Sequence, residues 1–323
     1  MSGDEDEFFP VEKKSKRSVG NESVKSNKKR GMVIDKNEDI DVSNNSNKKQ
    51  RKTEYKYEDT IDNDGYRLKA VIDTPILFKN IIDAIKELRN DVKMQWKTDG
   101  LYIETMDNAK VSVVYLFIEA GGFSEYICDT NVTTALNLDT VSSVIKSVTN
   151  DTIITITHDR NDTTLNILIK KKTSKTEVIL NLFDIEEDDI GIPDMDFDTV
   201  THLNSIELQQ YCNTYKNLLD KVVSDVRILI NKDEIIFEAN GEGNTKSIIT
   251  TLSKSNICDI HKKDVSINLS LVKLTAFTKA TNISKEVVIS ILQEHPISLE
   301  YPLVLDSVKI GWLRYYLAPK MDD

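Results

Sequence analysis

The chain repeats one order of predicted strands and helices in two halves, and this duplication constrains its fold more than any other feature. Four pairs of stretches correspond, at separations of 131 to 135 residues: 92–96 with 226–230, 100–104 with 234–238, Asn137-Leu138 with Asn268-Leu269, and 152–156 with 287–291. A separation this long indicates a duplicated domain, because the repeats of solenoid proteins are only about 20 to 50 residues long.

Each half alternates between half-buried strands and two short amphipathic helices. In the first half, strands are predicted at 66–72, 92–96, 101–106, 111–118, 152–157, 163–170 and 176–183. The first helix is expected to begin with Thr74 as its cap and Pro75 at its first position, and the second with Asp139 as its cap. The second half opens with a helix that starts at Asn204 and Ser205. This pattern predicts an α+β fold with the helices on one side of the sheet.

An acidic stretch, 184–198, separates the two halves. It holds eight acids and no base, and its Ile190-Gly191-Ile192-Pro193 core interrupts regular structure, because proline lacks an amide donor. We therefore interpret it as an exposed connector. The predicted organisation is a disordered charged tail at 1–65, an N-terminal domain at 66–183, the connector at 184–198 and a C-terminal domain at 199–323.

The tail differs from the rest of the chain in composition. It carries 14 Lys/Arg and 15 Asp/Glu, whereas residues 66–323 carry 28 and 38 and are strongly acidic. The tail is poor in apolar residues, so it cannot offset the entropy lost on ordering. The tail contains three basic clusters, at 13–17, 28–30 and 48–52. Such clusters are typical of nuclear import signals or nucleic-acid contacts. They also fit a tail that only increases solubility.

No pattern typical of an active site occurs in the chain. The four histidines, His158, His202, His261 and His295, lie far from one another and from any cysteine at ligand spacing, so no metal is expected. The three scattered cysteines predict neither a disulfide framework nor a metal site. No apolar run approaches the roughly 20 residues of a membrane-spanning helix. We therefore expect a binding protein rather than an enzyme, with no cofactor and no membrane contact.

Six stretches spread over residues 66–323 carry a resemblance to a known family: 83–88, Met106-Asp107, 150–155, 182–193 with Gly191-Ile192-Pro193, 277–281 and 314–320. Together they resemble proliferating cell nuclear antigen, the eukaryotic-type DNA sliding clamp. The resemblance implies a DNA-clamp fold with two similar clamp domains per chain. It also implies that three subunits close head to tail into a homotrimeric ring whose helices line the hole and whose sheets form the outside.

The resemblance further implies the function and the partners. Such a ring encircles double-stranded DNA and tethers DNA polymerase and other replication and repair enzymes, and a clamp loader places it on DNA. The family has no catalytic residues. Its members act in the nucleus, and for this chain we also consider a large DNA virus as the source, with a host nucleus or viral replication site as location. Strands near 176–182 of one subunit are expected to pair with strands near 246–252 of the next.

The lining of the hole is expected to be thin in this chain. The lysines at matching positions are Lys79, Lys86, Lys146, Lys216 and Lys279, of which Lys146 is placed on the second helix and Lys279 on the fourth. The family often has bases where this chain has Asn80, Ser143, Gln210, Asn213 and Asn217. An acidic protein is expected to be repelled by DNA phosphates. A closed ring around the DNA can nevertheless hold it, because encirclement needs only weak attraction to phosphates.

The resemblance also implies a pocket for partner peptides that end in paired aromatic residues. The matching positions are Met106, Lys110, Val111, Ile190, Gly191, Ile192, Pro193, Phe197, Pro296, Tyr316, Ala318 and Pro319. Lys110 stands where the family usually has a histidine. Lys232 matches a lysine that accepts ubiquitin in the family, which makes it a candidate modification site.

Two alternatives remain open at the level of the sequence. One is a checkpoint-type clamp paralogue that forms a hetero-ring, against which the intact pocket positions argue. The other is a nucleic-acid enzyme with a tail, against which the absence of a fixed carboxylate or metal cluster in the sequence argues.

Overall fold

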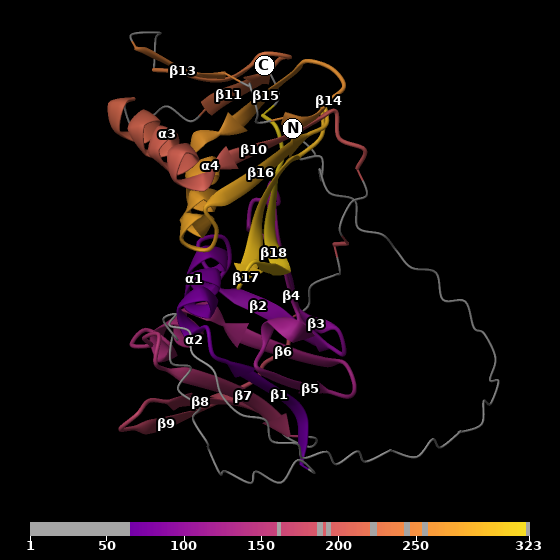
Figure 1. The fold of residues 1–323 in the computed structure, drawn as a ribbon, viewed down its shortest axis with the longest axis vertical. Helices are drawn as coiled ribbons and strands as arrows, with labels where there is room; N and C mark the ends of the chain where they lie inside the picture. Colours follow the sequence, from indigo (N-terminus) through magenta and orange to yellow (C-terminus); the bar gives the residue numbers. More distant parts are fainter. Residues whose placement is uncertain are drawn as a thin grey trace, which may run out of the picture. The chain divides into compact units, whose positions relative to one another are not determined.

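The computed structural model describes residues 65–159, 163–185, 190–191, 195–219, 225–241, 246–253 and 258–320. Within this part of the chain, two runs of helices and strands follow one another in the same order (Figure 1). The predicted tail, apart from Gly65, lies outside the described residues, as do Ile192 and Pro193 of the connector.

The first run occupies the N-terminal half of the described chain. Its elements are β1 (Tyr66–Ile72), α1 (Pro75–Ile85), β2 (Asp91–Lys97), β3 (Gly100–Met106), β4 (Ser112–Glu119), η1 (Ala120–Gly122), β5 (Glu125–Cys128), β6 (Val132–Asn137), α2 (Leu138–Val144), β7 (Ile153–Asp159), β8 (Thr164–Lys170) and β9 (Lys175–Asn181). The alternating burial of β2, β7 and β8 is the period-2 pattern of strands with one buried face.

The second run repeats the first. Its elements are β10 (Thr199–Asn204), α3 (Ser205–Leu218), β11 (Asp225–Ile230), β12 (Glu234–Asn240), β13 (Ser247–Ser253), β14 (Cys258–His261), β15 (Val265–Ser270), α4 (Leu271–Phe277), η3 (Thr278–Asn282), β16 (Glu286–Ile291), β17 (Ile297–Leu305) and β18 (Val308–Leu317). The first residues of β1 and β10, of α2 and α4, and of β9 and β18 are all 133 positions apart. The structure thus confirms the predicted duplication.

The described strands form three antiparallel sheets. One has the order β5-β1-β7-β8-β9 and another the order β13-β12-β11-β15. The third sheet has nine strands in the order β14-β10-β16-β17-β18-β4-β3-β2-β6, so it contains strands of both halves. The two halves join where β18 pairs with β4, in a register that places Tyr316 opposite Val113.

The helices lie on one side of the sheets in Figure 1, and contacts connect α1 with α2, α3 with α4, and α1 with η3. The buried face of α1 includes Phe78, Ile82 and Ile85. They pack into a core that also holds the fully buried Trp96, whose indole N–H donates to Thr134 Oγ1 at 3.0 Å. This core supports the helices on which the expected DNA-facing lysines were placed.

Helix starts were predicted to within two residues, but in part with the wrong caps. Asn137 caps α2 and accepts from Thr140 N at 3.1 Å, so the prediction of Asp139 as the cap is wrong; Asp139 lies in the first turn. Thr74 precedes α1, yet its side chain makes no capping hydrogen bond. Ser270 caps α4, so the counterpart of Asn137 lies two residues beyond the Asn268 matched to it in the sequence.

Two predicted helices are shorter than expected. The α2 helix ends at Val144, so Lys146 follows the helix instead of lying on it, and the buried Val148 also lies beyond it. The α4 helix ends at Phe277, so Lys279 lies on the short 3-10 helix η3. Each helix has only seven residues, too few for apolar spacing alone to locate the end.

Candidate functional site

A small apolar cluster, separate from the main core, lies on one face of β3, β4 and β18. We call it the Tyr316 cluster: its buried members are Val113, Tyr115 and Tyr316, and the partly buried residues packed on it are Met106, Ile190, Met195 and Trp312. Cross-strand pairing of Val113 with Met106 and with Tyr316 sets this arrangement. The rings of Tyr115 and Tyr316 meet edge to face, with centroids 5.7 Å apart. The cluster therefore draws residues from both halves and from the connector.

The connector is held to the sheet at Gly191. Its amide donates to Glu104 Oε1 at 2.6 Å, and its carbonyl accepts from the Tyr115 hydroxyl at 2.5 Å. Glu104 and Tyr115 are themselves cross-strand partners on β3 and β4. Gly191 has a φ of +75°, a left-handed conformation that glycine adopts without the steric cost of a Cβ. Both backbone groups of one connector residue are thus satisfied by side chains of the sheet.

Titratable side chains beside the Tyr316 cluster are held in place by hydrogen bonds and by burial. Burial, with the nearby Glu104 and Tyr316, raises the pKa of Tyr115 well above its usual value, so its hydroxyl stays a donor. Burial also opposes ionisation of Glu300, but hydrogen bonds from Lys309 and Arg314 outweigh it and lower the pKa of that carboxyl. Arg314 reaches Glu300 Oε2 through Nε at 3.0 Å and Nη2 at 2.5 Å.

The turn between β3 and β4 borders the cluster and depends on Asp107. The buried carboxylate of Asp107 accepts from the backbone amides of Val111 at 3.0 Å and Ser112 at 3.1 Å, and it forms an ion pair with Lys273 of α4. Burial of Asp107 opposes its ionisation, but hydrogen bonds from Lys273 and Ser112 outweigh this effect and lower its pKa. One carboxylate therefore connects this turn to the second half of the chain.

The structure brings most of the predicted pocket positions to this region. Met106, Ile190 and Tyr316 belong to the Tyr316 cluster, and Gly191 adjoins it. Val111, 36% exposed, and the exposed Lys110 lie on the adjoining turn. Ala318 donates from its amide to the Val111 carbonyl at 2.9 Å, which holds the segment with Ala318 and Pro319 against the same turn.

The remaining predicted pocket positions lie at its margins or outside the described residues. Pro296 is buried directly before β17, whose Ile297 pairs with Leu317. Phe197 is half-buried just before β10, outside the Tyr316 cluster as far as the described residues define it. Ile192 and Pro193 are outside the described residues. Sequence reasoning missed Glu104, Tyr115 and Met195, although the alternation along β4 could have indicated that Val113 and Tyr115 share a face.

On the helix side, two of the predicted lysines are already neutralised in part. Lys79 pairs with Asp83 at 2.6 Å, and Lys86 lies 3.3 Å from Asp139. The hydroxyl of Ser142 donates to Asp83 at 2.7 Å and accepts from Lys86 at 3.3 Å, which links α1 with the α2 helix. Burial opposes ionisation of Asp83, but the hydrogen bonds from Lys79 and Ser142 still lower its pKa.

The other predicted lysines are more exposed. Lys146 follows α2, Lys216 lies in the last turn of α3, and both are exposed. Lys279 on η3 is 3.7 Å from Glu87, with just over half of its side chain exposed. The helix side therefore offers fewer unneutralised positive charges than the lysine count suggests.

Lys232, the candidate modification site, lies exposed in the turn between β11 and β12. The side chain of Asn231 accepts hydrogen bonds from the amides of Asp233 at 2.9 Å and Glu234 at 2.8 Å. These bonds stabilise the turn that carries Lys232.

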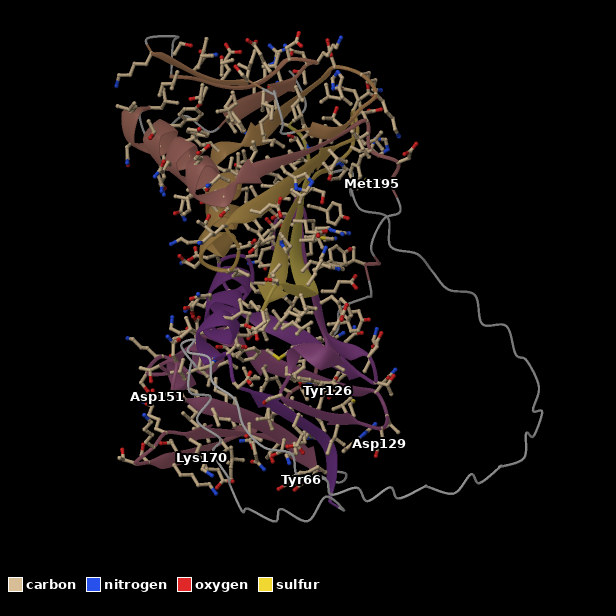
Figure 2. All side chains as sticks on the ribbon, viewed as in Figure 1. Tyr66, Tyr126, Asp129, Asp151, Lys170 and Met195 are labelled. Atoms are coloured by element: carbon tan, nitrogen blue, oxygen red, sulfur yellow. The ribbon has the colours of Figure 1, made fainter. Side chains whose placement is uncertain are left out.

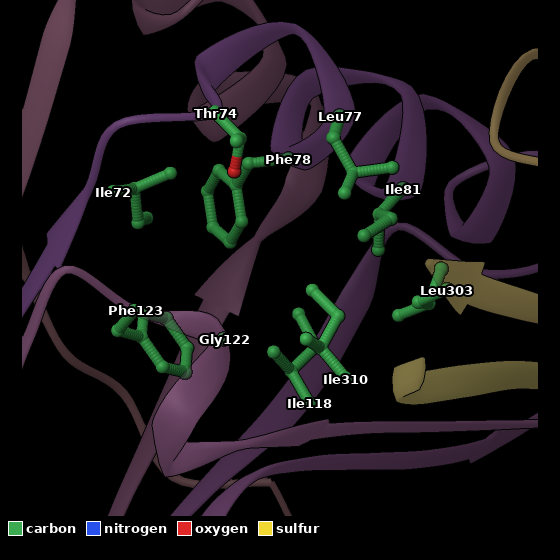
Figure 3. Close-up of a pocket in the computed structure, with 10 residues that line it drawn as sticks. All are labelled: Ile72, Thr74, Leu77, Phe78, Ile81, Ile118, Gly122, Phe123, Leu303 and Ile310. Carbon is green, nitrogen blue, oxygen red and sulfur yellow. The ribbon is translucent and has the colours of Figure 1, made fainter. Parts of the chain in front are cut away.

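A small apolar hollow lies elsewhere, between α1, η1 and the β17–β18 hairpin (Figure 3). Phe78 and Phe123 line it from the first half, and Leu303 and Ile310 from the second. It shares no lining residue with the Tyr316 cluster. In the described part of the chain, no group of three or more His, Cys, Asp or Glu is placed to hold a metal ion. No helix there is long and apolar enough to cross a membrane.

Comparisons with known proteins agree with this arrangement. Residues 67–191 match the family model of the N-terminal domain of proliferating cell nuclear antigen, and residues 191–320 match that of its C-terminal domain. A Caenorhabditis elegans protein of that name is 31% identical over 258 residues, covering 76% of this chain and 94% of the relative. The crystal structure of the Entamoeba histolytica protein superposes with a TM-score of 0.72 at 25% identity, covering 79% of this chain and 100% of that one.

Proposed function

The chain belongs to the proliferating cell nuclear antigen family and is a DNA sliding clamp that acts as a DNA polymerase processivity factor, and from that premise we propose that three copies close into a ring around duplex DNA. Clamps of this family bind DNA and partner proteins such as polymerases, and they serve DNA replication and repair. They are not enzymes, and we propose the same for this chain.

The order of strands in the sheets is the main observation that supports the ring proposal. In the duplicated unit, β18 is the counterpart of β9, and β13 is the counterpart of β4. Within one chain, β18 pairs with β4 and so joins two sheets into one of nine strands. The counterparts β9 and β13 are both edge strands. If β9 of one copy paired with β13 of the next, the contact between chains would have the same arrangement as the β18–β4 pairing within one chain. Such a head-to-tail contact can close into a ring.

Side chains on these two edges support the proposal. Ile179 on β9 is 63% exposed and Ile249 on β13 is 61% exposed. Unpaired edge strands with exposed apolar residues are prone to uncontrolled association, which natural proteins avoid by covering the edge. A closed ring would cover both edges at once.

We propose that partner peptides bind in a groove formed by the Tyr316 cluster, the turn at Lys110 and Val111, Ile190 and Gly191 of the connector, Phe197, Pro296, Ala318 and Pro319. Ile192 and Pro193, which lie outside the described residues, are expected from the family resemblance to take part. The buried and partly buried apolar side chains of the Tyr316 cluster suit a short peptide with a few large anchors. The acids of the connector would attract basic residues that flank such a peptide, mainly by raising the association rate.

The remaining assignments follow from the family. We propose the domain boundaries 66–183, 184–198 and 199–323, with 1–65 as a tail that carries import signals or nucleic-acid contacts. Lys79, Lys86, Lys146, Lys216 and Lys279 would face DNA, a clamp loader would open the ring, and Lys232 would be the modification site. Relatives in eukaryotes are nuclear, and we propose the nucleus, or a viral replication site, for this chain.

Light scattering on the full chain tests the ring. We expect a mass of three times 36.7 kDa for a homotrimer. A monomer at micromolar concentration would contradict the ring, and a stable complex formed only with a second type of chain would indicate a hetero-ring.

A further inference from the structure

A strongly basic hairpin lies outside the lysines discussed so far. The turn between β8 and β9 reads Lys170-Lys171-Lys172-Thr173-Ser174-Lys175, and the stretch from Thr163 to Thr176 contains no acid. Lys172 and Lys175 are exposed, as is Lys146 just after α2. In a body with ten more acids than bases, such a local excess of positive charge indicates an anionic partner.

The hairpin is held against the segment that follows α2. The side chain of Lys171 donates to the Ser147 carbonyl at 2.8 Å, and its amide donates to the Ser174 carbonyl at 2.8 Å, which closes the turn. A hydrogen bond from the Thr149 hydroxyl, and then the charges of Lys172 and Lys171, lower the pKa of Asp151. These contacts place the hairpin lysines beside the end of α2, and Figure 1 shows the turn on the side where α1 and α2 lie.

The strand register adds a second observation. Lys170 and Lys175 are direct partners across the β8–β9 ladder, and like charges directly opposite one another destabilise a sheet. Figure 2 labels Lys170 and Asp151 in this part of the first domain. This end of the hairpin therefore concentrates positive charge, which suits a ligand with closely spaced negative charges.

Because Lys79 on α1 and Lys86 at its C-terminal cap are paired with acids, the helices of the first half offer little phosphate attraction. We propose that Lys172 and Lys175 of the β8–β9 hairpin, beside the already assigned Lys146 after α2, form a further contact site for the DNA backbone that lies outside the helices. This inference rests on the proposed ring, because it needs the helix side to face DNA. The hairpin belongs to the β9 edge, so the contact would lie near each junction between subunits.

The test is the salt dependence of binding to a short linear duplex, measured by fluorescence anisotropy on the full chain. Each phosphate contact contributes about 0.9 to the slope of log affinity against log salt. Lys172→Ala/Lys175→Ala should therefore reduce the slope by about two, so that a fourfold rise in salt weakens the variant roughly tenfold less than the wild type. Lys232→Ala/Lys309→Ala removes the same charge elsewhere and should leave the slope unchanged.

Light scattering and retention on circular DNA distinguish a failure of the proposed ring from a failure of the hairpin site. A wild-type chain that is neither trimeric nor retained would overturn the ring and this site with it. A retained trimer whose slope is the same in wild type and hairpin variant would overturn the hairpin site alone. Lys172→Arg/Lys175→Arg should keep the wild-type slope, and a slope that falls in this variant too would point to altered structure instead of lost charge.

Discussion

The hydroxyl of Tyr115 donates to the carbonyl of Gly191 at 2.5 Å, across 76 positions of sequence, and this bond holds the connector over the sheet. Tyr115→Phe should free that carbonyl and weaken binding of a partner peptide about fivefold, since a neutral hydrogen bond contributes about 1 kcal/mol. The measurement is calorimetric titration with a Gln-x-x-hydrophobic-x-x-aromatic-aromatic peptide, together with hydrogen exchange at the Gly191 amide, which should become faster.

A matched control for this variant lies on the same face of the sheet. Tyr102→Phe removes a hydroxyl that donates to Asp99 at 2.7 Å and does not reach the connector. It should leave peptide affinity and Gly191 exchange unchanged. Equal effects of the two variants would mean that the Tyr115 hydroxyl has no special role in positioning the connector.

The second prediction concerns Ile192, which lies outside the described residues. If it forms a wall of the partner groove, Ile192→Glu should place an unpaired charge there and cost several kcal/mol of peptide affinity, on the order of the losses at interface hot spots. The trimer should remain intact, because the Tyr316 cluster and the hydrogen bonds that hold the connector at Gly191 involve β3, β4 and β18 and neither β9 nor β13. Wild-type affinity in an intact mutant ring, measured by calorimetry and sizing, would place the groove elsewhere.

The third prediction addresses the subunit edge. Ile179→Glu should prevent β9 from pairing with the next copy, because a charge would be buried at the joint without a partner. Light scattering should then report 36.7 kDa instead of three times that mass. Val304→Glu, at a residue 52% exposed near the end of β17, is the control and should stay trimeric. A trimer of the Ile179 variant would exclude this edge.

The fourth prediction concerns stability and pH. Asp107→Asn leaves Lys273 without its carboxylate partner and should lower the free energy of unfolding by about 2–4 kcal/mol, the cost of breaking a largely buried ion pair that is partly open to solvent. The pKa of Asp107 is lower in the folded chain than its usual 3.8. Its contribution is therefore complete at pH 7 and is lost as pH falls below 3.8 through the folded pKa.

Urea unfolding of both proteins at several pH values checks this prediction. The difference between wild type and Asp107→Asn should shrink as the pH is lowered below 3.8. A difference that is independent of pH would assign the loss to altered packing of the turn and not to the charge of Asp107.

The fifth prediction concerns the tail. Deletion of residues 1–65 should weaken binding to linear DNA and flatten its salt dependence, because the tail's basic clusters would no longer contact phosphates. Processivity on circular DNA after loading should change little, since the ring alone holds the DNA. An unchanged salt slope would leave the tail with a role in import or as a spacer.

Local sequence patterns were enough to predict most helices and strands. They did not show which strands distant in sequence pair with one another. Alternation located β2 and β7, and helical spacing located α1, because each depends on neighbours a few residues away. The prediction of Asp139 as a cap failed because Asn and Asp both cap helices well, and only the end of β6 at Asn137 shows where the helix begins. The Tyr316 cluster requires β18 to pair with β4, a contact about 200 residues apart that no periodicity encodes.

The continuous nine-stranded sheet has a mechanical consequence for a closed ring. Separating the two halves of one chain would break the β4–β18 ladder from Ser112 to Ile118 and pull apart Tyr115 and Tyr316. The chain also crosses that joint through its connector, which is fastened at Gly191. A seam between β9 and β13 of separate chains has no such covalent link, so a ring under outward force should part at a seam while every protomer stays rigid.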